Sequence, residues 1–360
     1  MTEPVMRGAL ERSTGMRRRG VWLIAAVALL SVSAMGDEAQ FPAKTGVLDV
    51  QRPMAALAPQ TEFAIEGRPD WMAVTPDGVW VTSSSANHVV RLNVWTNEAD
   101  HVVTVSKPCS GLATGFGGLW IPSCGDGKLV EVDAISGKPW REVAVAPADS
   151  EGGVTTGAGS VWIVSAAQSE TTPDTAPEPA AGKRRAVPLK VVLDRIDPMK
   201  GVVVARIPLP DGSYNPLFAA GSVWVTCNKG NALVRVDPKT NAVAGTTPTG
   251  KMPRFLTFGA GSVWTLNQGD GTVTRVDAKT GRVVATIAAG IPGLGGEIAF
   301  GEGSVWATVF GFPITRIDPT TNRVTEQWVG TGGDSIRVAH GSVWLTYLMG
   351  AKVARIPTPQ

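Results

Sequence analysis

A pattern of hydrophobic and polar positions repeats about every 40 residues along most of this 360-residue chain. Each copy is centred on a tryptophan in a segment of alternating apolar and small polar residues, and the seven copies contain Trp80, Trp120, Trp162, Trp224, Trp264, Trp306 and Trp344. The intervals between them are 40, 42, 62, 40, 42 and 38 residues, and 22 inserted residues in the third copy account for the long interval. A fixed period of this length indicates a repeat architecture of seven units.

Each repeat contains four short segments with the alternation of β-strands. In the copy around Trp264 we expect strands at residues 255–258, 262–266, 272–276 and 282–287. A second signature, Arg-Val-Asp or a variant, follows the tryptophan by 10 or 11 residues in six copies, and the insertion in the third copy delays it to Arg195. Turns such as Asp237-Pro-Lys-Thr-Asn241 suit tight connections, because Pro presets φ and Asn accepts a positive φ.

Seven four-stranded antiparallel sheets around one axis make an all-β, seven-bladed β-propeller. The last repeat ends near Arg355 and lacks an outer strand, whereas an additional strand at residues 61–65 precedes the first tryptophan. We expect this N-terminal strand to complete the last blade and close the ring, which removes exposed sheet edges. The propeller is expected to span residues 61–360.

Residues 1–36 have the composition of an export signal peptide. Three arginines at 17–19 precede an apolar run over residues 21–32, which is too short to cross a bilayer because a span needs about 20 residues. An uncleaved N-terminal anchor is the alternative. Residues 37–60 have no periodicity and are expected to form a tether. We therefore predict a periplasmic or secreted protein, without a membrane span after cleavage, and a monomer.

Charge excludes one class of partner. The chain has 33 Lys and Arg against 31 Asp and Glu, and without residues 1–36 the balance is 28 against 29. A near-neutral chain lacks the basic surface that binds nucleic acid. Nucleic acid is therefore not an expected partner.

The repeats also resemble those of a known group of proteins. Gly159-Ser-Val-Trp-Ile, Gly221-Ser-Val-Trp-Val-Thr and Arg235-Val-Asp-Pro-Lys-Thr-Asn are similar to segments of YVTN-type seven-bladed propellers and of the streptogramin (virginiamycin B) lyase-like group, and the likeness extends over about residues 61–357. It implies a propeller and, by analogy with the lyases, His and Glu side chains around a divalent metal just after the tryptophan strand. Here those positions contain Ser83, Ser123, Ser165, Cys227, Asn267, Val309 and Tyr347, so the lyase set is not matched.

Two sets of loops lie on one face of a propeller, namely those that lead into each innermost strand and those that join the second strand to the third. We call this face the mouth. The repeats differ from one another in these loops, as a ligand site on a repeated frame requires. The candidate ligand-binding residues are Asp70, Trp71, Asn215, Asn228, Arg254, Asn267, Phe310 and Asp334.

Four carboxylates belong to the loops that lead into the innermost strands: Asp70, Glu151, Glu297 and Asp334. Together they suit a cationic ligand or a hard divalent ion such as Mg²⁺ or Ca²⁺. No Asp-x-Asp-x-Asp spacing occurs, so no metal-binding residues are assigned.

Cys109 and Cys124 flank a hairpin that turns at Gly117-Gly118, which places them nearly opposite on adjacent strands. In an exported protein we expect them to form a disulfide, whereas Cys227 is expected to be buried and inert. The insertion, at about residues 168–188, is acidic and proline-rich and then basic. It is expected to be a surface loop, and a lid or docking arm over the mouth is the alternative.

Two functions are compatible with these features. The first is an exported propeller that binds a small molecule, peptide or protein partner at the mouth, without a defined cofactor. The alternative is a lyase or hydrolase of the streptogramin-lyase-like type, with or without a divalent metal, that uses Glu151 or Glu297 as base and Tyr214 or Tyr347 as acid. Because no histidine is expected at the mouth, we favour binding.

Overall fold

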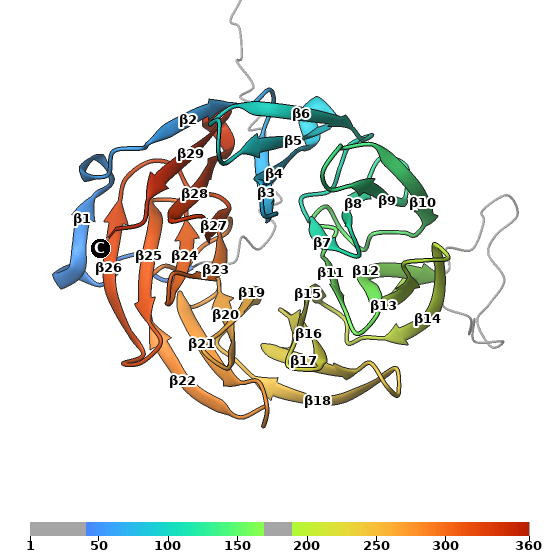
Figure 1. The fold of residues 1–360 in the computed structure, drawn as a ribbon. Helices are drawn as coiled ribbons and strands as arrows, with labels where there is room; N and C mark the ends of the chain where they lie inside the picture. The colour runs from blue at the N-terminus through green and yellow to red at the C-terminus, as the bar shows by residue number, and fades with distance from the viewer. Residues whose placement is uncertain (1–40, 169–188, 360) are drawn as a thin grey trace, which may run out of the picture. The chain divides into compact units, whose positions relative to one another are not determined.

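The computed structural model describes residues 41–168 and 189–359. These residues form seven sheets arranged around a common axis, as Figure 1 shows, and the predicted seven-bladed β-propeller is confirmed. The expected export signal and residues 169–188 of the insertion lie outside the described residues. No helix within the described part of the chain is long and apolar enough to cross a membrane.

The first four blades are four-stranded, and in each the first strand lies innermost (Figure 1). Blade one contains β3 (Pro69–Val74), β4 (Gly78–Ser83), β5 (His88–Asn93) and β6 (Ala99–Thr104). Blade two contains β7 (Ala113–Gly115), β8 (Gly118–Ser123), β9 (Lys128–Asp133) and β10 (Pro139–Ala144). Blade three contains β11 (Val154–Gly157), β12 (Ser160–Gln168), β13 (Leu189–Asp197) and β14 (Val202–Pro208). Blade four contains β15 (Ser213–Ala219), β16 (Ser222–Cys227), β17 (Ala232–Asp237) and β18 (Ala242–Pro248).

The remaining blades follow the same plan, and blade seven is completed from the N-terminal side. Blade five contains β19 (Pro253–Gly259), β20 (Ser262–Asn267), β21 (Thr272–Asp277) and β22 (Val283–Ala288). Blade six contains β23 (Glu297–Gly301), β24 (Ser304–Val309), β25 (Phe312–Asp318) and β26 (Arg323–Val329). Blade seven contains β27 (Ile336–Ala339), β28 (Ser342–Tyr347), β29 (Lys352–Pro357) and, as its outer strand, β2 (Thr61–Ala64). Short 3₁₀ turns, η3 (Ser84–Ala86) and η4 (Leu348–Gly350), lie in loops at the mouth.

The ring is closed as the sequence predicts. Strand β2 pairs antiparallel with β29, with Thr61 opposite Arg355. In blade five the observed strand ends differ from the predicted ones by no more than two residues. The alternation of side chains along each strand is therefore sufficient to locate the blades.

The segment expected to be a tether contains an additional strand. Strand β1 (Gln51–Pro53), between η1 (Leu48–Val50) and η2 (Met54–Ala56), pairs in parallel with the outer strand of blade six, with Gln51 opposite Gln327. Upstream of it, Lys44 Nζ donates a hydrogen bond of 2.9 Å to Phe310 O in a mouth loop. This strand was not predicted from the sequence, because three residues are too few to produce a visible alternation.

The repeated tryptophans pack between blades. All seven are fully buried, and Trp80 of blade one, for example, lies in a cluster with Leu119, Ile121 and Val132 of blade two. Each tryptophan except Trp80 donates its indole N–H to the backbone carbonyl five residues earlier. A large aromatic ring whose N–H has a hydrogen-bond partner is well suited to fill the space between two blades. The tryptophans therefore recur for a structural reason.

The repeated arginines connect neighbouring blades on the face opposite the mouth. Arg195 stacks 5.0 Å from the ring centroid of Trp162 and donates to Pro238 O and Asn241 Oδ1 in the next blade, at 2.7 and 2.9 Å. Arg355 of blade seven makes the equivalent bonds to Val94 O and to the Asn97 side chain of blade one, both at 2.7 Å. These arginines therefore contribute to closing the ring.

Candidate functional site

Four carboxyl side chains from different blades converge near the axis at the mouth. Asp70 belongs to β3 and Glu297 to β23, whereas Glu151 and Asp334 lie in the loops before β11 and β27. Burial, followed by repulsion from Asp334, raises the pKa of Asp70 well above its ordinary value, and the charges of Glu151 and Glu297 add to the rise. The sequence analysis placed these four residues in one set of loops, and the structure brings them together.

Asp70 and Asp334 form a carboxyl pair. Burial raises the pKa of Asp334 as well, and hydrogen bonds from Gly296 N–H and from Asp70 oppose the rise. Ser110 Oγ donates to Asp70 Oδ2 at 2.7 Å. Because two charged carboxylates that lie close together repel each other, Asp70 binds a proton more readily than an isolated aspartate does.

Glu151 is neutralised by an arginine from another blade. Arg254, in β19, forms an ion pair with Glu151 of blade three. Its guanidinium carbon lies 4.7 Å from the ring centroid of Tyr214 and 5.8 Å from that of Phe255. Burial raises the pKa of Glu151, and the charge of Arg254 opposes this rise. Tyr214 thus acts as a stacking surface for Arg254.

Glu297 is buried and fully paired. Arg337 of β27 lies 2.5 Å from Glu297 Oε1, while Ser335 Oγ donates to Oε2 and Ile336 N–H donates to the same oxygen at 3.3 Å. Burial raises its pKa, and the charge of Arg337 opposes the rise. Both oxygens of Glu297 thus have partners, and the side chain connects Arg337, Ser335 and the backbone of β27.

A cavity of about 270 Å³ lies along the axis between the innermost strands. Trp71 and Phe255, from blades one and five, meet edge to face there with their ring centroids 5.7 Å apart. Asn215 also lines this cavity; its Nδ2 donates to Arg254 O at 2.9 Å, and its buried Oδ1 has no partner within the described structure. Of the predicted residues, Trp71 and Asn215 line this cavity together with Glu297, and Arg254 pairs with Glu151.

A second cavity of about 440 Å³ opens at the mouth beside Asp70. Two basic residues, Arg68 and Lys107, line it together with Ser110 and several other hydroxyl groups. Asp70 is the only carboxyl residue among those of the described chain that line this second cavity.

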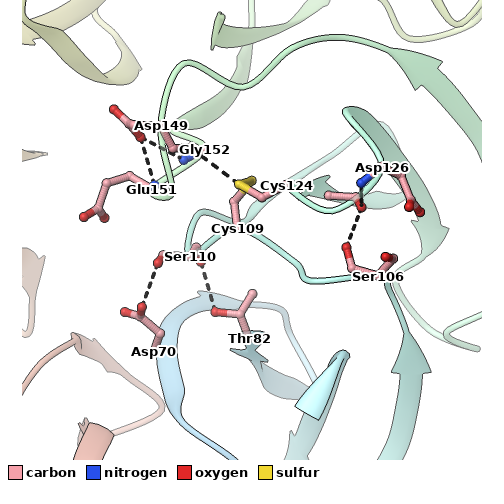
Figure 2. Close-up of a disulfide and its surroundings, with 11 residues drawn as sticks. Asp70, Thr82, Ser106, Cys109, Ser110, Cys124, Asp126, Asp149, Glu151 and Gly152 are labelled. Carbon is pink, nitrogen blue, oxygen red and sulfur yellow. Dashed lines mark hydrogen bonds between the residues drawn. A yellow bond between two sulfur atoms is a disulfide. The ribbon is translucent and has the colours of Figure 1, made fainter. Parts of the chain in front are cut away.

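A disulfide supports the site from blade two (Figure 2). Cys109 and Cys124 are bonded, with their Cα atoms 5.1 Å apart, as predicted. Gly152 packs directly on Cys109: a Cβ at this position would lie 2.7 Å from the sulfur, and its φ of +57° also favours glycine. Ser110 N–H donates to Ser150 O, and Gly111 N–H donates to Glu151 O. The disulfide-bonded segment thus holds the loop that carries Glu151 and places Ser110 against Asp70.

The other predicted residues do not join this group. Asn267 is buried and donates to Thr272 and Thr274 of its own blade. Tyr347 lies against Lys352, 4.8 Å from its ring centroid, and burial raises the pKa of Tyr347. Two further predicted residues show no side-chain bond to the carboxyl groups in the described structure: Asn228, whose buried Oδ1 has no partner, and Phe310, which is 41 % exposed.

Sequence reasoning missed the partners that neutralise the carboxylates, above all Arg337 and Ser335. Arg337 follows Asp334 by three residues on an innermost strand, but no motif distinguishes it from other arginines. In the described part of the chain, no three His, Cys, Asp or Glu side chains are arranged to hold a metal ion. Because two of the four carboxylates already pair with arginines, the residues fit a divalent metal poorly.

Comparisons with known proteins identify the fold. No protein-family model and no curated protein matches the sequence. The structure of streptogramin B lyase superposes with a TM-score of 0.62 and 19 % identity, covering 82 % of this chain and 96 % of that chain. Hydrazine synthase of Kuenenia stuttgartiensis gives a TM-score of 0.62 and 13 % identity, covering 83 % and 97 %. The predicted resemblance is confirmed for the architecture: this chain is a seven-bladed β-propeller that shares the fold of streptogramin B lyase.

Proposed function

We propose that this protein is an exported propeller that binds a small ligand through a positively charged nitrogen group at the mouth. The observation that carries the proposal is that two of the four carboxyl groups at the mouth have no ion-pair partner. Glu151 and Glu297 have arginine partners, whereas the carboxyl pair of Asp70 and Asp334 is in no ion pair within the described structure. An ammonium or guanidinium group replaces the proton of this pair and gains two charge-assisted hydrogen bonds.

The surroundings of the pair suit an organic cation. Trp71, which follows Asp70 on β3, and Phe255 line the axial cavity and offer aromatic surface there. A cation near an aromatic face gains about 0.5–2 kcal/mol beyond its ion pairs. Asn215 provides a buried acceptor without a partner in the described structure, which suits a second N–H of the ligand.

Export is part of the proposal. The Cys109–Cys124 disulfide is typical of proteins that fold in an oxidising compartment, such as the periplasm or the extracellular space. The arginine-rich start and the short apolar run of residues 1–36 agree with this location. A monomer is proposed because one chain closes the ring by itself, with β2 completing blade seven.

The test is calorimetric titration of the purified protein with alkylamines and alkylguanidines. We expect binding that weakens at least tenfold in Asp70→Asn and in Asp334→Asn, since each variant removes one charge from the pair. Asp126→Asn is the matched control, because Asp126 also lies in a mouth loop but outside the group. Equal binding by wild type and both pair variants would contradict the proposal.

A lyase or hydrolase is the second candidate, and one observation favours it. Burial raises the pKa of both Asp70 and Asp334, and a carboxyl group with a raised pKa is suited to general acid and base catalysis. In this version Asp70 and Asp334 perform the proton transfers, while Glu151, Glu297 and Tyr214 position them and Tyr347 stays outside the group. Mass spectrometry of the titrated ligand separates the two functions, because a binding protein returns the ligand unchanged.

A further inference from the structure

We propose that the second cavity is an anion subsite, so that the ligand of this protein is a zwitterion with a cationic group at Asp70 and a carboxylate at Arg68 and Lys107. This inference rests on the proposed function and names the class of ligand: an amino acid, an ω-amino acid or a short peptide with free ends. The subsite is adjacent to the carboxyl pair, because Asp70 lines the same cavity as the two basic residues.

The cavity supplies donors on most sides. Besides the two cations, the side chains of Ser84, Ser85 and Ser110 line it. Ser110 already donates to Asp70, so this hydroxyl connects the two subsites. Arg68 and Lys107 are exposed and are in no ion pair within the described structure, so their charges remain available to a ligand. A guanidinium with neighbouring hydroxyls is well suited to a carboxylate.

A comparison of the blades shows that these two cations are specific to this corner of the mouth. In five blades a residue at or just before the start of the innermost strand pairs with a residue near the end of the second strand. We compare the residue immediately before that pairing residue in each of the five blades. That position is basic in the two adjacent blades that line the cavity and uncharged in the other three: Arg68, Lys107, Ala146, Gly212 and Met252. The repeat itself therefore does not require a cation here.

The backbone at Arg68 and at Lys107 is held by turns with defined contacts. Lys107 has a positive φ of 40°. Its N–H donates to Asn87 Oδ1 at 2.9 Å, and its carbonyl accepts a bond from Cys124 N–H at 3.0 Å. Gly67, before Arg68, has a φ of +82°, and a Cβ there would lie 2.6 Å from the hydroxyls of Ser83 and Ser85. Fixed backbones lower the entropy that the binding of an anion costs.

The test compares two series of probes of matched length by calorimetry, ω-amino acids of three to eight carbons and the corresponding alkylamines. The series covers a range of separations between the two charges. We expect the best ω-amino acid to bind wild type about tenfold more tightly than its amine. The double variant Arg68→Gln/Lys107→Gln should abolish this preference and leave the affinity for the amine unchanged.

Lys229→Gln is the matched control, because Lys229 is an exposed mouth lysine that pairs with Asp211 away from the cavity. It should change neither affinity. Equal affinity of wild type for both series, or a preference that survives in the double variant, would overturn the anion subsite while the proposed function stands. Absence of binding by both series would overturn the proposed function together with this inference.

Discussion

The two faces of this propeller are built from the ends of the same strands, yet they follow different rules. On the face opposite the mouth, Arg195 and Arg355 make nearly identical bonds to the next blade. At the mouth each blade contributes a different group, and Asp70 and Asp334 form no ion pair among the described residues. The comparison teaches that the repeats supply stability and that the deviations from them supply the site.

The exception on the opposite face supports this view. In blade two, Glu131 occupies the position of the repeated arginine, and Arg141 of the neighbouring strand pairs with it at 2.7 Å. Arg141 then donates to Pro198 O in blade three, as the repeated arginines do in their own blades. The bond between blades is thus kept, although a residue of the neighbouring strand now makes it. At the mouth, by contrast, the charged and aromatic groups differ from blade to blade.

The largest effect is expected where the repeat is broken. Trp264→Ala should lower the free energy of unfolding by about 4 kcal/mol, because it removes a fully buried ring between two blades and leaves Gly259 O without its donor. Chemical denaturation measures this. Trp95→Ala, at a position that is 77 % exposed, should change stability by less than about 0.5 kcal/mol, and equal losses would contradict the assignment of the repeated ring as a wedge.

The next effect concerns the one mouth carboxylate that is fully paired. Arg337→Leu should destabilise by about 3 kcal/mol at neutral pH, because it leaves the charge of Glu297 buried without a counterion. The double variant Glu297→Gln/Arg337→Leu should recover most of the loss. Denaturation of both variants at pH 7 is the measurement, and a double variant as unstable as the single one would refute the pairing.

The disulfide should affect both stability and the site. Cys109→Ser/Cys124→Ser should lower the free energy of unfolding by about 2 kcal/mol, since it releases a loop with a sequence separation of 15 residues. Amine binding should weaken too, because the segment places Ser110 against Asp70. Cys227→Ala, which alters a buried thiol away from the carboxyl groups, should leave amine affinity unchanged. Unaltered amine affinity in the disulfide variant would show that the Cys109–Cys124 disulfide does not position the residues of the mouth.

The smallest expected effect on stability is that of Asp70→Asn, and this variant should stabilise the protein, whereas the variants above destabilise it. Folding raises the pKa of Asp70 above its ordinary value of 3.8. At pH values between 3.8 and the raised pKa, the folded state therefore binds more protons than the unfolded state. The stability from this group is complete below pH 3.8 and is lost as pH rises through the raised pKa. Asp70→Asn should remove this slope and stabilise the protein at pH 7 by about 1 kcal/mol. A pH series of denaturation curves that is identical in both proteins would contradict the buried charge.

Most of the frame was predictable from the sequence, because repetition multiplies weak local signals. The strand ends around Trp264, the closing strand at residues 61–65 and the Cys109–Cys124 disulfide all follow from spacing and alternation. Strand β1 was missed because a parallel pairing of three residues leaves no period.

The site was predictable only as a set of loops. Register assigns Asp70, Glu297 and Asp334 to the mouth, but it does not determine how far each side chain reaches across the ring. Arg254 reaches Glu151 two blades away, and Asn267 turns into its own blade. The first outcome depends on packing between residues far apart in the sequence, since Arg254 and Glu151 are separated by 103 positions.

The most direct test of the central claim is the number of protons released when the mouth binds a cation. Titration of hexylamine in two buffers of different ionisation enthalpy, at a pH where the pair holds its proton, measures this number. We expect release of up to about one proton per amine by wild type and none by Asp70→Asn, because the amine takes the place of the proton between Asp70 and Asp334. Binding without proton release, or equal release by the variant, would contradict the account.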